Sequence, residues 1–130
     1  MNIIKRLAIL LTFVRLTLGG YSQNTAEELY KKAKHYDSIG SIENAIKLYT
    51  STIEKDSLYK NAYFNRASLN CEQGFFDKAL IDFLKFDKLS PDDFETLYLL
   101  AFCYYKLNNY ERSLFYANKT LLVSPNYFDA

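Results

Sequence analysis

Hydrophobic and polar positions along this 130-residue chain repeat at an interval of 34 residues. Such a regular interval indicates one supersecondary unit that is copied and stacked, because a single unit cannot bury its apolar face alone. Helical spacing within each interval predicts two helices per unit, and we expect units at 26–59, 60–93 and 94–127. Small residues recur in two columns, where they let paired helices approach closely: Ala33, Ala67 and Ala101, and then Ala45, Ala79 and Ser113.

Local signals predict where these helices begin and end. Thr25 and Glu28 form a capping box at the start of the first helix, in which each side chain satisfies a free backbone amide. Gly40, Gly74 and Asn108 occupy equivalent positions at the ends of the first helices, and these residue types tolerate a left-handed C-terminal cap. The second helices are expected to begin near Ile42, Phe76 and Tyr110 and to end near Asp56, Ser90 and Ser124.

These columns resemble the tetratricopeptide repeat (TPR) family, whose unit is a helix-turn-helix of about 34 residues. The resemblance covers residues 26–127 and implies an all-α, right-handed α-solenoid of three repeats, with the start of a fourth at 128–130. The second unit carries most of the family's columns, namely Tyr63, Ala67, Gly74, Ala79, Phe83 and Pro91. The departures are Lys32 and Arg66 in place of an apolar residue, Asn70 in place of an aromatic one, Phe86 in place of Ala, and Ala117 where the other units have Tyr49 and Phe83.

Residues 1–22 do not follow the repeat and have the three parts of a secretory signal peptide. Lys5 and Arg6 precede an apolar run at 7–14, and residues 20–22 offer small residues around a cleavage point. The run is too short to span a bilayer. A buried amphipathic helix is the alternative interpretation. We expect the segment to be removed and the mature protein to be exported, to the periplasm or the extracellular space.

Composition agrees with one helical domain and excludes nucleic acid as a partner. The chain contains 4 Gly and 2 Pro, too few for a turn-rich β-sandwich, whereas 12 Tyr and 10 Phe supply a large apolar core. The net charge is +1, but three of the 16 basic residues lie within residues 1–22. The remaining 13 basic and 15 acidic residues give about −2, which leaves no excess positive charge for binding phosphates.

Partners of TPR proteins usually lie in the concave groove formed by the first helix of each unit, and the resemblance places a corresponding groove here. Tyr30, Phe64 and Tyr98 stand in register and are expected to anchor an extended peptide or a helix. The alternative is that these rings only shield the seams between helices. Transferred position by position, the predicted groove residues are Tyr30, Lys34, Asn61, Phe64, Asn65, Ser68, Tyr98, Phe102 and Tyr105.

One known use of the family, a clamp for the C-terminal carboxylate of chaperones, is disfavoured. Asn65 matches the clamp, but Tyr30 and Lys34 stand at the first-unit positions and Glu95 and Leu99 at the third-unit positions. A carboxylate that faces Glu95 would be repelled rather than bound.

Catalysis finds no support in the residue pattern, and no cofactor, metal or small-molecule substrate is expected. His35 is the single histidine and lies in mid-helix, without a Cys or Ser placed to partner it. The sequence lacks a Gly-rich phosphate loop and zinc-ligand spacing. Cys71 and Cys103 are interpreted as small buried hydrophobic residues. The alternative is a disulfide, which requires Cβ atoms within about 4.5 Å.

These observations predict a non-enzymatic protein–protein interaction scaffold that binds peptide or protein segments in an aromatic groove. Two alternatives stay open: the N-terminal sensory region of a longer membrane-bound signalling protein, and a self-associating structural module. Apolar residues near the C-terminus, including Leu114, Leu121 and Leu122, predict an uncapped end. That end offers a surface for further repeats, for a second copy or for a partner.

Overall fold

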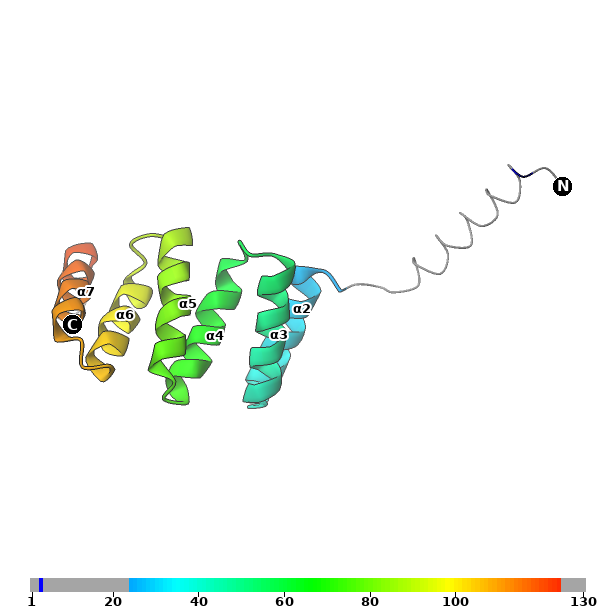
Figure 1. The fold of residues 1–130 in the computed structure, drawn as a ribbon, viewed down its shortest axis with the longest axis horizontal. Helices are drawn as coiled ribbons and strands as arrows, with labels where there is room; N and C mark the ends of the chain where they lie inside the picture. The colour runs from blue at the N-terminus through cyan, green and yellow to red at the C-terminus, as the bar shows by residue number, and fades with distance from the viewer. Residues whose placement is uncertain (1–2, 4–23, 125–130) are drawn as a thin grey trace.

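The computed structural model describes residue 3 and residues 24–124. Apart from Ile3, the predicted signal peptide lies outside the described residues, as does the predicted start of a fourth repeat at 128–130. The described part is all-helical and contains no strand, which confirms the predicted all-α solenoid (Figure 1). Its helices are α2 (Ala26–Ser38), α3 (Ile42–Lys55), α4 (Lys60–Glu72), α5 (Phe76–Leu89), α6 (Phe94–Lys106) and α7 (Tyr110–Val123).

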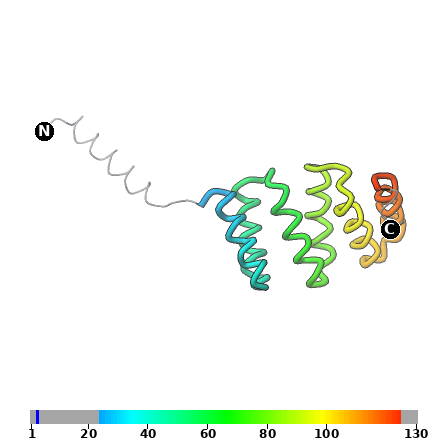
Figure 2. Tube along the Cα trace, turned by 180° about the vertical axis from the view of Figure 1, so that it is seen from behind, coloured from blue at the N-terminus to red at the C-terminus, as the bar shows by residue number. Residues whose placement is uncertain are grey.

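The helices form three antiparallel pairs that stand side by side in one row. Figures 1 and 2 show the pairs α2/α3, α4/α5 and α6/α7 in chain order along the long axis of the molecule. Each helix packs most extensively on its partner in the pair, and neighbouring pairs meet through α3–α4 and α5–α6. None of the described helices has the length and the apolar character needed to cross a membrane.

Caps define the ends of the first helices as the sequence predicts. The Glu28 amide donates to Thr25 Oγ1 at 3.2 Å, and the Thr25 amide donates to Glu28 Oε2 at 2.9 Å. Gly74 has φ +79°, and Asn108 adopts the same left-handed conformation with φ 59°. Because a left-handed residue reverses the chain, the next amide reaches back to the helix, and the Phe75 amide donates to the Asn70 carbonyl at 2.8 Å.

The small-residue columns lie at the centre of each helix pair. Ala33, Ala45, Ala67 and Ala79 are fully buried. Ser113 replaces alanine in its column. Its hydroxyl is accommodated there because it donates to the Ala101 carbonyl at 2.9 Å. The predicted columns are therefore close-packed helix contacts, as in protein interiors generally.

Tyr36 differs from the expectation that large residues in its column fill the core. Its side chain is 37% exposed, whereas the equivalent Asn70 and Tyr104 are buried. The equivalents on α4 and α6 are covered by the preceding unit, and no unit precedes α2 among residues 24–124. Asn70 breaks the aromatic pattern, and its buried side-chain amide is satisfied because it donates to the Arg66 carbonyl at 3.0 Å.

Candidate functional site

Seven of the nine predicted groove residues line two cavities along the first helices, whereas Lys34 and Ser68 line neither. The first cavity, here called the groove cavity, has a volume of about 170 Å³; the second, here called the end pocket, has a volume of about 390 Å³. The groove cavity is lined by Tyr30, Asn61, Phe64, Asn65, Phe86, Asp93 and Glu95. The end pocket is lined by Tyr98, Ala101, Phe102, Tyr105, Ser113, Ala117, Thr120 and Leu121.

The groove cavity brings together residues from all three units. Tyr30 comes from α2, Asn61 and Phe64 come from α4, and Glu95 comes from the first turn of α6. Residues so far apart in the sequence meet there because α3 packs on α4 and α5 packs on α6, which joins consecutive units in one row. The cavity therefore lies on the face where the sequence predicts a groove.

Hydrogen bonds fix Asn65 at the base of this cavity. Its amide nitrogen donates to the hydroxyls of Tyr30 and Tyr49, each at 3.1 Å. Tyr49 is fully buried, and its hydroxyl donates a hydrogen bond to Asp37 Oδ2 at 3.0 Å. Burial first, and then the Asp37 charge, raise the pKa of Tyr49 above its ordinary value, so this hydroxyl stays a donor at neutral pH. Asn65 is thus committed to contacts inside the protein.

Aromatic packing surrounds the cavity and holds its rings in place. Phe64 lies edge-on to Phe83, with ring centroids 5.7 Å apart, and 5.3 Å from Phe86. Tyr30 lies 4.8 Å from Tyr59. Of the three registered aromatics, Tyr30 and Phe64 are half-buried and contribute to helix seams. The third, Tyr98, is 49% exposed.

Carboxylates line the cavity on the α6 side. Asp93 caps α6, and its Oδ1 accepts hydrogen bonds from the Thr96 amide at 2.9 Å and the Thr96 hydroxyl at 2.7 Å. Glu95 is exposed, and no hydrogen bond or ion pair engages its side chain within the described part of the chain. Another carboxylate, that of Glu27 on α2, accepts a hydrogen bond from the Tyr59 hydroxyl at 2.5 Å. This hydrogen bond, with one from Lys31, holds the pKa of Glu27 below its ordinary value.

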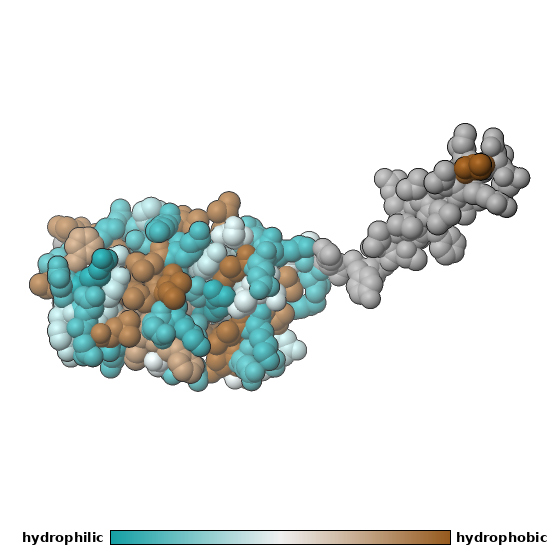
Figure 3. Space-filling view, in the orientation of Figure 1, coloured by the Kyte–Doolittle hydropathy of each residue, from teal (hydrophilic) through white to brown (hydrophobic). Residues whose placement is uncertain are grey.

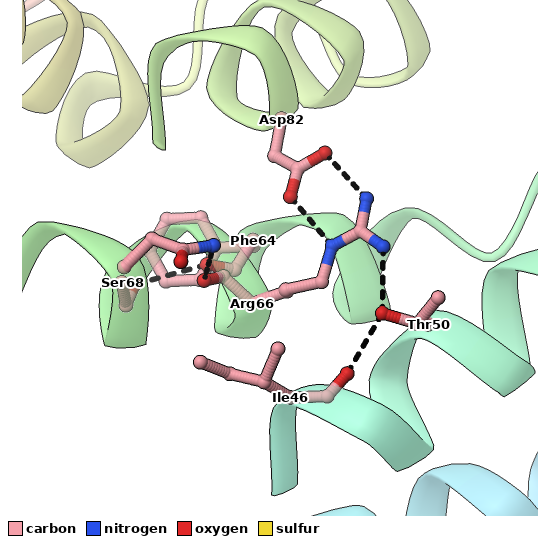
Figure 4. Close-up of polar contacts among 7 residues, drawn as sticks. Ile46, Thr50, Phe64, Arg66, Ser68 and Asp82 are labelled. Atoms are coloured by element: carbon pink, nitrogen blue, oxygen red, sulfur yellow. Dashed lines mark hydrogen bonds and ion pairs between the residues drawn. The ribbon is translucent and has the colours of Figure 1, made fainter. Parts of the chain in front are cut away.

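Arg66, a departure from the family pattern, joins three helices through its guanidinium and lines neither of the two cavities (Figure 4). Its guanidinium donates to both carboxylate oxygens of Asp82 on α5, at 2.7 and 2.8 Å, and to Thr50 Oγ1 on α3, at 2.9 Å. The hydrogen bonds to Asp82 raise the pKa of Arg66 above its ordinary value. The side chain of Asp82 is only 5% exposed, so this bidentate pair is largely shielded from water.

Sequence reasoning missed the residues that α5 and α7 contribute to the two cavities. Phe86 lines the groove cavity, and Ala117, Thr120 and Leu121 line the end pocket. The sequence marks two of these residues as unusual, because Phe86 and Ala117 both differ in size from the residue that the repeat pattern has at their positions. The face in Figure 3 shows apolar residues interrupting the polar surface, including at the C-terminal end of the row.

The cysteines and the acidic residues give no sign of a second kind of site. Cys71 and Cys103 are free thiols, and Cys103 is fully buried. Burial raises the pKa of Cys103 to about 12 and also raises the pKa of Cys71. Within residues 24–124, no three His, Cys, Asp or Glu side chains converge as metal ligands would.

Comparisons with known proteins agree with the fold. The tetratricopeptide repeat family model matches residues 94–127. No curated protein matches the chain.

Similar solved structures include MamA, with 18% identity, a TM-score of 0.73 and coverage of 83% of this chain and 59% of that one. The first TPR of Spaghetti (RPAP3), bound to an HSP90 peptide, has 23% identity and a TM-score of 0.72, over 80% and 82% of the two chains. YrrB, a TPR protein with an unusual peptide-binding site, has 17% identity and a TM-score of 0.72, over 82% and 55%.

This chain spans about three-fifths of the length of the MamA structure. At such identities the likeness shows the fold. The family model matches the third of the three helix pairs, and the 34-residue register relates the other two pairs to it in the same α-solenoid fold.

Proposed function

We propose that this chain is a non-enzymatic interaction scaffold that binds peptide or protein segments along its first helices. The observation that carries the proposal is the groove cavity, which takes residues from all three units and combines rings with polar groups. Two of the similar structures are described by the peptides or peptide-binding sites that they contain, which supports this class of function.

The groove cavity favours a basic side chain on the bound segment. Asp93 and Glu95 supply negative charge beside the rings of Phe64 and Phe86, and a cation is attracted by both kinds of group. Lys60 is the opposing charge, 5.9 Å from the Phe86 centroid, but its ammonium donates to Ser90 Oγ and the two carboxylates outnumber it. We therefore expect a Lys or Arg of the partner to lie between these rings and Glu95.

A chaperone C-terminus is not the expected ligand, although the Spaghetti structure holds such a peptide. The amide nitrogen of Asn65, the one residue that matches the clamp, already donates to Tyr30 and Tyr49. A terminal carboxylate would also meet the charge of Glu95.

Two peptides that differ in one charge test this proposal. The probes are a fluorescein-labelled extended peptide with a Phe and a Lys, and the same peptide with Glu in place of Lys. Fluorescence anisotropy should show that the wild-type chain binds the Lys peptide about two- to fivefold more tightly, because an exposed ion pair contributes up to about 1 kcal/mol. Glu95→Lys should reverse this preference.

Glu111→Lys is the matched control, because Glu111 is also an exposed acidic residue in the first turn of its helix. This variant should keep the wild-type preference. Equal binding of both peptides by the wild-type chain, or a preference that Glu95→Lys leaves unchanged, would remove the basic segment from the proposal.

We also propose that the mature protein is exported after removal of residues 1–22. The basic start, the apolar run at 7–14 and the small residues at 20–22 support this. N-terminal sequencing of the protein from its own host should begin after residue 22. Recovery of intact Met1 in a cytoplasmic fraction would refute both cleavage and export.

A further inference from the structure

A third cavity, here called the junction cavity, lies where the first two units meet. It has a volume of about 310 Å³ and is formed by α3, α4 and α5. It shares no lining residue with the groove cavity or the end pocket. Its walls include two apolar residues, Ile46 and Ile81. Its polar lining residues are Thr50, Arg66, Asn70, Lys78 and Asp82.

At this cavity a small polar residue replaces a ring. Asn70 occupies the position that Tyr104 has in the third unit. Tyr104 is buried, its ring stacks on Tyr116, and the guanidinium of Arg112 lies 5.9 Å from its centroid. Lys78 is the equivalent of Arg112, and Asn70 offers it no ring. The space that a tyrosine would fill therefore contributes to the junction cavity.

The described chain leaves the junction cavity uncovered, although both units that form it are present. Its three helices lie side by side within the row, and Ile81 at its edge is 68% exposed. A further repeat after α7 would extend the row at the end far from α3 (Figure 1). The cavity is thus not a face on which the next unit of a solenoid would stack.

The lining carries one excess positive charge. Arg66 and Asp82 form a bidentate pair, so their charges offset each other. Lys78 is exposed; within residues 24–124 its ammonium lies 4.8 Å from the centroid of the Phe75 ring and enters no ion pair. The charge of Glu54 also acts on Arg66, from outside the lining. A ligand with one negative charge would complement Lys78.

Hydrogen-bond donors of the lining remain available beside this ammonium. A guanidinium has five N–H groups, and hydrogen bonds within the protein engage three of those of Arg66 (Figure 4). The side-chain amide of Asn70 has two N–H groups, of which one donates to the Arg66 carbonyl. Charged and neutral N–H donors together are the groups that recognise a carboxylate. The apolar walls suit the methylene groups that carry it.

We propose that the junction cavity binds an acidic side chain of a partner protein, with its carboxylate between Lys78 and Arg66. A protein segment supplies this group rather than a small acid, because Ile81 and Phe75, exposed by 68% and 49%, offer apolar contacts to the flanking residues. A phosphate group, with up to two charges, would meet the Asp82 carboxylate and only one excess cation. The inference extends the proposed scaffold function to a second site with the opposite charge preference.

Two short peptides that differ in one charge test the site. The probes are acetyl-Leu-Glu-Leu-amide and the same peptide with Gln in place of Glu. Two-dimensional NMR titrations should show that the Glu peptide shifts the Arg66 Nε–H signal and the Lys78 amide signal in a saturable way. The Gln peptide should bind about two- to fivefold more weakly, as expected for the loss of an exposed ion pair.

Three variants sharpen this test. Lys78→Gln should remove the preference for the Glu peptide, and it should stay folded because Lys78 is exposed. Lys88→Gln is the matched control, an exposed lysine of the same helix that lines none of the three cavities, and it should keep the preference. Asn70→Tyr copies Tyr104 and fills the cavity from within, so it should weaken binding about tenfold or more. Circular dichroism checks its fold, and Lys78→Gln alone decides if it unfolds.

Controls separate the junction cavity from the groove cavity. Glu95→Lys should leave these titrations unchanged, and Lys78→Gln should leave the preference of the groove cavity for the Lys peptide unchanged, so either proposal can fail alone.

Three results would overturn the inference. The first is equal binding of the Glu and Gln peptides by the wild-type chain, and the second is a preference that Lys78→Gln leaves unchanged. The third is inorganic phosphate that produces the same shifts at concentrations where the Glu peptide produces none, which would make the cavity a site for free anions.

Discussion

The two junctions between units occupy the same positions of the repeat but consist of opposite chemistry. Where the first unit meets the second, the guanidinium of Arg66 joins Asp82 to Thr50 through charged hydrogen bonds. One repeat later, the equivalent residues belong to a single apolar cluster. These equivalents of Arg66, Asp82 and Thr50 are Leu100, Tyr116 and Leu84.

A second set of positions shows the same contrast. Tyr30, Tyr49 and Asn65 are linked by hydrogen bonds at the first junction. The spacing of the ring pair is nevertheless almost identical in the first and second units, 5.8 Å and 5.7 Å. Ring packing and the alanine columns therefore set the geometry within a unit, and the polar groups are a local addition to it. The equivalent residues at the second junction are Phe64, Phe83 and Leu99.

The largest predicted effect comes from removing one half of the charged pair. Asp82→Ala leaves the guanidinium of Arg66, which is only 20% exposed, without its counter-charge. Loss of one partner of a shielded pair destabilises by about 3 kcal/mol. Urea unfolding followed by circular dichroism measures this loss. Asp77→Ala, at an exposed position of the same helix, is the control and should change the midpoint little. Equal midpoints for the two variants would show that the pair contributes nothing to the junction.

The second prediction concerns the alanine columns, which the units share. Ala67 is fully buried between α4 and its neighbours, so Ala67→Leu should destabilise by about 2 kcal/mol through overpacking. Lys47→Ala, at an exposed position whose ion pair with Glu43 faces water, should change stability by no more than about 0.5 kcal/mol. Thermal unfolding compares the two. Identical melting temperatures would mean that the alanine columns are not close contacts.

The repeat period accounts for how much of this fold follows from the sequence. Helix starts at Ile42, Phe76 and Tyr110 follow from registered caps and small residues, because both act locally. The pairing of Arg66 with Asp82 does not follow from the sequence, because it depends on which faces of two different helices meet. The sequence marks Arg66 as a departure from the pattern without indicating its partner.

The candidate site is less predictable than the fold for a similar reason. Asn65 matches a family position for ligand contact, yet its side-chain amide donates to two tyrosine hydroxyls, and the sequence alone does not show that these groups meet. The end pocket depends on a missing ring at Ala117, and the sequence shows that residue is small without showing what lies around it. Cavities arise from differences between units, whereas the period describes what the units share.

The third prediction tests the hydrogen bonds of the first junction. Tyr49→Phe copies Phe83 of the second junction and removes the hydroxyl that links Asn65 to Asp37. The expected loss is about 1 kcal/mol, since the ring packing is kept.

The pH dependence gives this third prediction a second readout. The pKa of Tyr49 in the folded protein lies above its ordinary value of 10.0, so its contribution to stability is complete below pH 10.0 and is lost as the pH rises further. Wild-type stability should therefore fall more steeply than that of Tyr49→Phe in alkaline solution. Parallel pH profiles would contradict the linkage.

The smallest predicted change comes from the most extensive substitution. Thr50→Leu, Arg66→Leu and Asp82→Tyr together copy the apolar residues of the second junction into the first. Replacing a shielded ion pair and its partners by packed apolar groups is often neutral or stabilising, because the cost of removing the charges from water disappears. The free energy of unfolding should therefore stay within about 1 kcal/mol of the wild-type value or exceed it, although Asp82→Ala alone costs about 3 kcal/mol. Should the triple variant unfold as readily as Asp82→Ala, the charged residues would be required for the first junction, and the two junctions would not be equivalent in packing.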